Sequence, residues 1–249
     1  MLHEFSRIEL IFDKAGMDRL YNAKVLVFGV GGVGGLAIEG MARSGIQHFE
    51  IYDDDKISIT NINRQLVATH SNIGKYKVDV IKERILDINP NAIVTTHKTF
   101  FLPEIADTIN FGAYDYVVDC IDTIAAKIEL AKRCKSAGVR LISAMGAGNK
   151  LDPTQFRVVD LAETLYDRLA KVMRKELKRR GIQHMKVVYS VEQSNRIDNV
   201  ERGEFEAESS KHTKTVTPGS VAFVPGAMGL IIAGEVVKDI AFDKYFLVE

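Results

Sequence analysis

The chain has 249 residues, of which 46% are hydrophobic and 27% charged, and this suits one large α/β domain or a domain plus a small appendage. Its 33 basic and 33 acidic residues cancel, so the net charge predicts no partner. Its two cysteines, Cys120 and Cys134, form no Cys-x-x-Cys pair, which argues against a disulfide framework and against a four-cysteine zinc site. The first residues lack the charged, apolar and small-residue order of a signal peptide, so we expect a cytoplasmic protein.

Short apolar strands alternate with helical stretches over the first 143 residues. One or two short helices are expected over residues 3–23. The pattern then predicts strands at 24–28, 48–52, 92–97, 115–119 and 139–143. It predicts helices near 33–44, 76–88, 102–109 and 123–137. This alternation predicts an α/β, Rossmann-like fold, in which a mostly parallel sheet carries helices on both faces.

A different pattern follows residue 143. Two further strands are predicted at 156–160 and 186–190, with a strong basic helix at 166–180 between them. Residues 192–217 are polar and acid-rich, so we expect a long mobile loop there. The apolar stretch at 221–240 contains proline, glycine and charged residues, so it predicts a buried C-terminal helix or a subunit interface rather than a membrane span.

The whole chain is therefore interpreted as a single domain, 1–249. Residues 1–23 supply N-terminal helices and residues 24–150 form the nucleotide-binding core. Residues 151–249 form an extension that we expect to face the substrate and a second subunit.

A glycine-rich turn follows the first strand and contains Gly29, Gly31, Gly32 and Gly34. Glycines let the backbone turn tightly and approach a phosphate, and the helix that follows offers free N–H groups at its N-terminus. The second strand ends at Asp53, where a ribose hydroxyl needs an acceptor. The turn predicts a nucleotide site, although dehydrogenases, flavoproteins and methyltransferases share this fingerprint.

Charged side chains at the ends of the strands indicate which nucleotide binds. Arg64 can fork to phosphate oxygens and Lys77 can supply a point charge. Asp122 can hold a magnesium ion that bridges phosphates. A nicotinamide cofactor needs no such set, so these residues favour ATP over NAD. The alternatives are that Asp53 and Asp122 only cap turns and that the two cations lie on exposed helix faces.

Five separated motifs resemble, in the right order, those of the ubiquitin-activating-enzyme-like (ThiF/MoeB-type) adenylating family. They are Gly29-x-Gly31-Gly32-x-Gly34, Asp53-x-Asp55, Asn61-x-x-Arg64-Gln65, Gly74-x-x-Lys77 and Asp119-Cys120-x-Asp122. The resemblance covers roughly residues 5–150. It implies binding of ATP and Mg²⁺ and adenylation of a carboxylate.

The resemblance also implies roles for single residues. The nucleotide contacts that it implies are Gly29, Gly31, Gly32, Gly34, Asp53, Asp55, Asn61, Arg64, Lys77, Asp122 and Thr123. The catalytic residues that it implies are Arg7, Arg64, Lys77 and Asp122, with Asp122 also the metal ligand. Arg7 resembles an N-terminal arginine that reaches the ATP of a neighbouring subunit, which implies a homodimer.

Two departures from the family pattern concern cysteine. The zinc cysteines of the sulfur-carrier activators are missing, and no cysteine follows Cys134 to act as the usual late nucleophile. Covalent thioester transfer is therefore not expected.

The second half resembles the tRNA threonylcarbamoyladenosine dehydratase branch of the family, over residues 152–158, 169–182 and 186–192. This implies ATP-dependent cyclodehydration of threonylcarbamoyladenosine in tRNA by activation of its carboxylate. The basic helix carries an apolar stripe on one face and can hold tRNA phosphates with the other, unless that face is merely solvated. The candidate tRNA contacts are Lys171, Arg174, Lys175, Lys178 and Arg179.

Other functions stay open at this point. One is adenylation of the C-terminal glycine of a small ubiquitin-like sulfur-carrier protein, and another is a non-catalytic nucleotide-binding scaffold. An NAD oxidoreductase is a further alternative. The expected partners are tRNA, a second copy of the chain and, by family resemblance, a cysteine desulfurase or sulfur-acceptor system.

Overall fold

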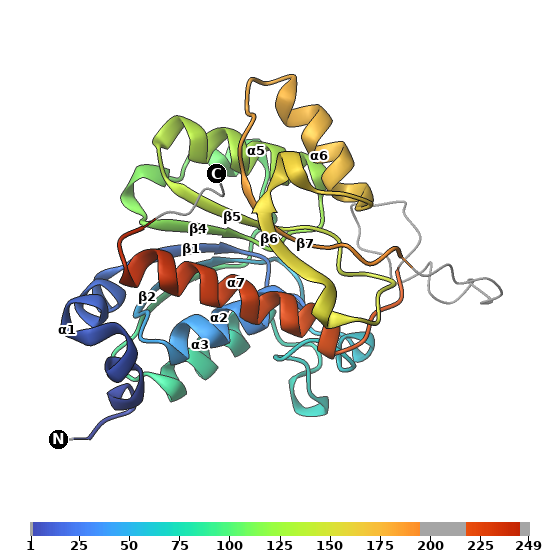
Figure 1. Cartoon of the computed structure of the whole chain (residues 1–249). Coiled ribbons are helices and arrows are strands. Elements are labelled where there is room, and N and C mark those ends of the chain that lie inside the picture. The colour runs from blue at the N-terminus through green and yellow to red at the C-terminus, as the bar shows by residue number, and fades with distance from the viewer. Residues whose placement is uncertain (1, 195–217, 245–249) are drawn as a thin grey trace.

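The structure, a computed structural model, describes residues 2–194 and 218–244 (Figure 1). Over these residues, seven strands form one sheet in the order β3-β2-β1-β4-β5-β7-β6. The strands are β1 (Lys24–Phe28), β2 (His48–Tyr52), β3 (Ile93–His97), β4 (Tyr116–Asp119), β5 (Arg140–Ala144), β6 (Phe156–Asp160) and β7 (Lys186–Ser190). Neighbours pair in parallel except β6, which runs antiparallel to β7. The predicted Rossmann-like sheet is thus confirmed.

Helices cover both faces of this sheet, as the alternating pattern predicts. The longer ones are α1 (Ser6–Asn22), α2 (Gly34–Arg43), α3 (Lys77–Ile88), α5 (Ile124–Ala137), α6 (Arg168–Lys178) and α7 (Phe223–Ala241), with a short α4 (Pro103–Ala106). Single 3₁₀ turns lie at Ile59–Asn61, His70–Asn72, Phe111–Ala113, Pro153–Gln155 and Leu161–Glu163. Figure 1 shows α1, α2, α3 and α7 on one side of the sheet and α5 and α6 on the other.

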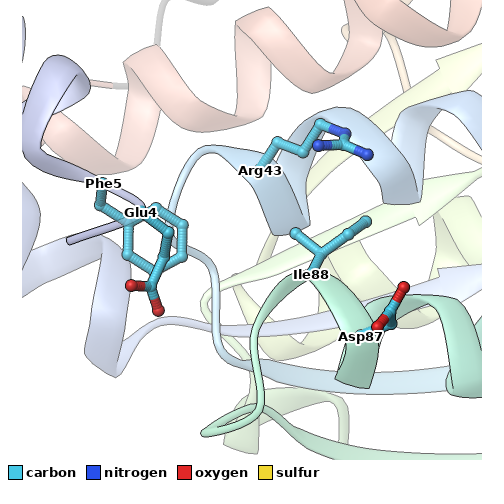
Figure 2. A pocket seen from close by; sticks show the side chains of 5 residues that line it. All are labelled: Glu4, Phe5, Arg43, Asp87 and Ile88. Carbon is cyan, nitrogen blue, oxygen red and sulfur yellow. The ribbon is translucent and has the colours of Figure 1, made fainter.

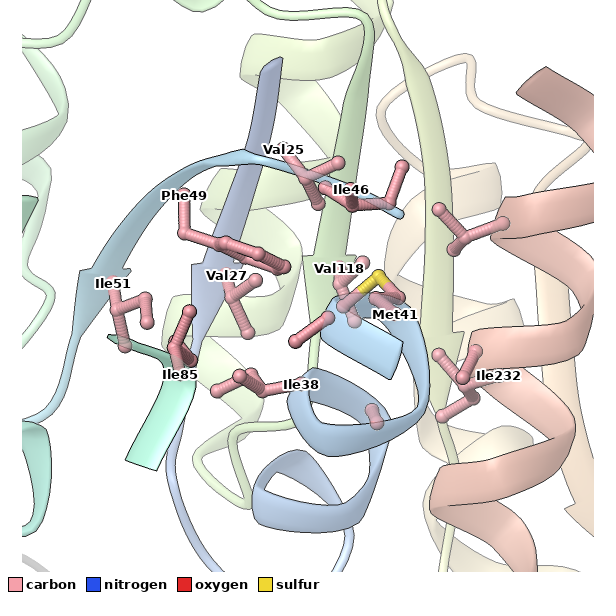
Figure 3. Packing of buried hydrophobic residues seen from close by; sticks show 14 of the residues in the cluster. Val25, Val27, Ile38, Met41, Ile46, Phe49, Ile51, Ile85, Val118 and Ile232 are labelled. Atoms are coloured by element: carbon pink, nitrogen blue, oxygen red, sulfur yellow. The ribbon is translucent and has the colours of Figure 1, made fainter. Parts of the chain in front are cut away.

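The larger hydrophobic core lies under the first of these helix layers (Figure 3). Val25 and Val27 of β1 and Val118 of β4 pack there against Ile38 of α2 and Ile232 of α7. These strands are buried on both faces, and that explains why they read as nearly continuous apolar runs rather than alternating ones. A second core, under α5 and α6, occupies the opposite face.

The chain reverses direction in the sheet between β1 and β4. It leaves β1 outward through β2 and β3 and then returns to place β4 on the other side of β1. The pairs Phe28↔Tyr52 and Phe28↔Asp119 bring the carboxyl ends of the three central strands to one edge. Ligands of open α/β sheets bind at such a switch point, so the fold places a binding site there.

Helix α7 is joined to the sheet by buried charges. Lys186 of β7 lies 2.9 Å from Asp239 and 2.7 Å from Glu235, and the Tyr116 hydroxyl donates to Asp239 at 2.7 Å. The predicted buried C-terminal helix is therefore confirmed. Within the described residues, no helix has both the length and the apolarity needed to cross a membrane.

Two predicted boundaries are wrong. The helix expected at 102–109 is only the short α4, because the Thr108 side chain donates to the carbonyl of Ile105 and competes with further helix. The helix expected from 166 begins at Arg168, since Asp167 caps it and Tyr166 has a left-handed backbone. The one or two short helices expected over residues 3–23 are confirmed as α1, whose two helical segments meet at a kink at Asp13, where φ is 55°. Most of the loop expected at 192–217 lies outside the described residues.

Candidate nucleotide-binding site

The glycine turn leaves β1 in a conformation that only glycine allows. Gly29 has φ +94°, and a Cβ there would lie 2.8 Å from the carbonyl oxygen of Cys120. A Cβ on Gly34 would lie 1.9 Å from the carbonyl oxygen of Gly29, so the turn closes on itself. A Cβ on Gly31, in contrast, would meet no described atom within 4 Å. The turn therefore packs tightly against β4 and leaves open space above Gly31, as a phosphate-binding turn requires.

Asp53 joins the end of β2 to this turn. Its Oδ2 accepts the N–H of Val30 at 2.7 Å and its Oδ1 accepts the N–H of Asp55 at 2.9 Å. Burial raises the pKa of Asp53, while Lys77 and the two backbone donors act in the opposite direction. The carboxylate is thus oriented beside the glycine turn, where the sequence predicts the ribose acceptor.

Lys77 is the first residue of α3 and is only 5% exposed. Its Nζ lies 2.6 Å from Oδ2 of Asp55, and its backbone N–H donates to the Asp55 carbonyl at 3.1 Å. Asp55 therefore holds the predicted cation, Lys77, just beyond the end of β2, and Asp55 itself is two residues after Asp53. Nearly all of its side chain is out of solvent, so a phosphate that replaced Asp55 would meet a poorly hydrated charge.

The segment from Asn61 to Arg64 passes directly beside the glycine turn. A Cβ on Gly32 would lie 3.3 Å from the carbonyl oxygen of Arg64 and 3.2 Å from Pro225 of α7. The Arg64 guanidinium donates to the Thr60 carbonyl at 2.8 Å, and burial lowers the pKa of Arg64. The Asn61 carboxamide accepts the N–H of Ser58 at 3.2 Å. Both predicted phosphate contacts therefore belong to an ordered segment adjoining the turn.

A buried ion pair holds the end of β4, and sequence reasoning did not identify it. Lys127 of α5 donates to Asp119 at 2.9 Å, to the Ser143 hydroxyl at 3.1 Å and to the Ala144 carbonyl at 2.7 Å. Asp119 also accepts the N–H of Ile121 at 3.1 Å, which shapes the turn toward Asp122. A signal was present: Lys127 shares the helical spacing of the apolar residues of its helix, where a lysine requires a buried partner.

Asp122 itself is exposed at the carboxyl edge of the sheet, and Thr123 precedes α5 as its N-cap residue. A carboxylate in this position suits Mg²⁺, which is usually held by one or two carboxylates together with substrate phosphates. Carboxylate oxygens of Asp53, Asp54 and Asp55 also lie within 4.8 Å of one another. Two of those three already serve Val30 and Lys77, so Asp122 fits the metal better.

Arg7 is the one predicted catalytic residue that a single chain places away from these groups. It is exposed in the first turn of α1, close to Phe5. Phe5 lines a surface depression of about 380 Å³ together with Arg43 and Ile88, the last residues of α2 and α3 (Figure 2). Those helices run antiparallel to the strands, so the depression lies at the edge of the sheet opposite the glycine turn. Within one chain, Arg7 therefore does not join the site.

The predicted tRNA contacts lie along α6. Those that the helix leaves exposed are Lys171, Lys175, Lys178 and Arg179, whereas Arg174 is half-buried and donates to the Thr164 carbonyl at 2.6 Å. The predicted apolar stripe is confirmed for Met173 and Leu177, which are buried, but not for Val172, which is 39% exposed. The Asp167 cap accepts the N–H of Gly146, just beyond β5, at 3.1 Å, so α6 begins at the same edge as the nucleotide site.

Comparison with known proteins agrees with this geometry. The model of the ThiF family matches residues 5–244. The chain belongs to the ThiF family. The family match extends well beyond the glycine turn and the strand-end charges, through the basic helix α6 and the whole of α7.

Several similar proteins carry the same name. The chain is 44% identical to tRNA threonylcarbamoyladenosine dehydratase of Bacillus subtilis over 98% of this chain and 96% of that protein. It is 38% identical to the enzyme of that name from Escherichia coli, over 68% of this chain and 63% of that protein. A crystal structure of the E. coli tRNA N6-threonylcarbamoyladenosine dehydratase in complex with ATP is similar with a TM-score of 0.83 and 30% identity, covering 96% of this chain and 94% of that one.

Proposed function

We propose that the protein catalyses the ATP-dependent cyclodehydration of threonylcarbamoyladenosine in tRNA, by activating the carboxylate of that nucleoside. The observation that carries this proposal is the likeness to the B. subtilis relative over almost the whole chain. Because the likeness includes the extension beyond residue 150, it supports the substrate class as well as the nucleotide site.

The strand-end residues support a role for each part of ATP. Asp53 accepts the ribose hydroxyls, and the N–H groups of the glycine turn face the phosphates. Arg64 and Lys77 stabilise the charge that builds on the α-phosphate as the substrate carboxylate attacks it and pyrophosphate leaves. Lys77 exchanges its contact with Asp55 for a phosphate oxygen in this step. A magnesium ion held by Asp122 would neutralise charge on the phosphates.

Ring closure then needs no nucleophile from the protein. A nitrogen or oxygen of the same nucleoside attacks the activated carbonyl, the ring bond forms, and AMP leaves with the carboxylate oxygen. Holding the two groups of one substrate close together is sufficient to make this second step fast.

A homodimer is part of the proposal. Arg7 is remote from the site in its own chain, so it can act only on the ATP of a second copy. Helix α1 also exposes large apolar side chains, with Leu10 87% and Ile11 70% exposed, as expected of a surface that another subunit covers. A cysteine desulfurase or sulfur-acceptor partner rests on the family resemblance alone.

The test is mass spectrometry of tRNA nucleosides. tRNA that carries uncyclised threonylcarbamoyladenosine is incubated with the protein, ATP and Mg²⁺, and then digested. We expect the nucleoside to lose the mass of one water, with AMP and pyrophosphate formed in step. No mass change, combined with pyrophosphate exchange driven by a small sulfur-carrier protein, would favour the carrier-adenylation alternative.

A further inference from the structure

Tyr166 has an unusual backbone conformation for its residue type. In the part of the chain that the structure describes, the non-glycine residues with positive φ are Asp13, Asn149, Tyr166 and Asp243. Asp and Asn enter the left-handed region readily because their short polar side chains hydrogen-bond locally. A tyrosine at φ 60° has no such compensation, so the residue type at this position works against folding.

The side chain does not recover this cost by packing. Tyr166 is 68% exposed and its neighbour Leu165 is 57% exposed, so a large aromatic and a large aliphatic side chain both face solvent. Buried contacts would justify a bulky residue in a strained position, and here they are few. Such exposure of a large aromatic ring is typical of a surface that contacts a binding partner.

The surrounding structure holds the backbone of Tyr166 at the same edge of the sheet as the nucleotide site. Asp167 accepts the N–H of Ala170 at 2.8 Å and that of Gly146 at 3.1 Å, so it joins the start of α6 to the loop after β5. Its own N–H donates to the Leu165 carbonyl at 2.8 Å, which closes the turn around Tyr166. β5 pairs in parallel with β4, whose end leads to Asp122. The turn that carries Tyr166 therefore lies at the edge where the substrate carboxylate must be activated.

Cations follow the ring along α6. Arg168, Lys171 and Lys175 are exposed within the two turns after Tyr166. An exposed aromatic ring beside a row of cations is the arrangement with which proteins bind single-stranded RNA, since bases stack on the ring while the cations contact phosphates. A peptide partner would not require positive charge along the whole flank.

We propose that Tyr166 stacks on an unpaired base of the tRNA substrate and so positions the modified nucleoside over the site. This inference rests on the proposed function, because it assigns a substrate contact to that same site. The ring acts on binding and position, and it takes no part in bond making.

Kinetics separate this role from a structural one. Tyr166→Ala is expected to raise KM for tRNA about 10- to 100-fold, the range for loss of one stacked base, without changing KM for ATP. Tyr166→Phe and Tyr166→Trp retain an aromatic face and should stay close to wild type. Tyr166→Gly suits φ 60°, so its melting temperature should not fall although its KM for tRNA rises like that of Tyr166→Ala.

The sequence also permits a direct optical test, because it contains no tryptophan. Tyr166→Trp therefore carries a single indole, whose fluorescence should be quenched when uncyclised tRNA is added without ATP. The matched control is Ile93→Trp, at a 60% exposed position on the opposite edge strand β3, where tRNA should leave the emission unchanged.

The two proposals fail in different ways. If wild type cyclises tRNA but Tyr166→Ala has an unchanged KM for tRNA and Tyr166→Trp is not quenched, the stacking proposal is overturned and the enzyme function stands. If wild type forms no cyclic product from authentic substrate, the proposed function is refuted, and quenching of Tyr166→Trp by tRNA would still support the contact.

Discussion

Two aspartates at the end of β4 should respond to the same substitution in opposite ways. Asp119 is 1% exposed and paired with Lys127, whereas Asp122 is exposed and accepts a 3.3 Å hydrogen bond from the neighbouring Thr123 hydroxyl. Asp119→Ala should therefore impair folding, and Asp122→Ala should abolish catalysis in a protein that remains folded.

The magnitudes follow from burial. Removing Asp119 leaves the fully buried Lys127 without its counter-ion, which costs about 3–5 kcal/mol. For a chain of this size each kcal/mol lowers the melting temperature by roughly 2–4 °C, so the expected loss is on the order of 10 °C. Removing an exposed carboxylate such as Asp122 changes stability by less than about 0.5 kcal/mol.

Both variants are measured by thermal unfolding and by tRNA-dependent consumption of ATP. Asp122→Ala should have the same melting temperature as the wild-type protein and should consume no ATP above the tRNA-free background. Normal turnover in that variant would remove Asp122 from the mechanism. An Asp119→Ala variant that melts like wild type would refute the reasoning from burial.

Further predictions concern the helix α2 and the glycine turn. Burial alone would raise the pKa of Glu39, but the contacts of Arg84 and a second arginine outweigh it and hold the pKa below its usual 4.5. The stabilisation is therefore present above about pH 4.5 and is lost as the pH falls through the lower pKa that Glu39 has in the folded protein. Glu39→Gln should lower the free energy of unfolding, measured in urea at pH 7, by roughly 1–2 kcal/mol, and by progressively less toward pH 3. Gly34→Ala should prevent folding, since its methyl would overlap the Gly29 carbonyl; a wild-type melting curve would contradict this. Gly31→Ala should melt normally and bind ATP more weakly in calorimetric titration, because its methyl enters space that we assign to phosphate.

Much of the fold was predictable because each central strand is buried on both faces. The buried residues 25–28 and 116–118 are apolar throughout, and glycine or a strand-end carboxylate then marks where each strand stops. The carboxyl ends of parallel strands share one edge, so the order of motifs along the chain was enough to place Asp53 and Asp122 near the same switch point. The boundary errors occurred where a single side chain determines the end of a helix, as Thr108 does after α4.

Tertiary partners could not be predicted in the same way. The contacts of Lys127 with Asp119 and of Lys186 with Asp239 join residues whose proximity depends on how helices settle on the sheet. The left-handed backbone at Tyr166 is likewise set by tertiary structure, because Asp167 bonds to the loop after β5. Local propensity alone continues the helix through this residue.

The cysteines explain why one activation step suits this chain. The thiolate is the nucleophilic form of cysteine, and burial raises the pKa of Cys120 to about 12 and that of Cys134 still further from neutrality. The chain has no other cysteine, so no thiol is available at neutral pH to take an acyl group from an activated carboxylate. An activated carboxylate must then react with water or with a group already held beside it. If the acyl group is transferred to a nucleophile within the same substrate, the protein need not release the activated intermediate. Cyclisation is such a transfer.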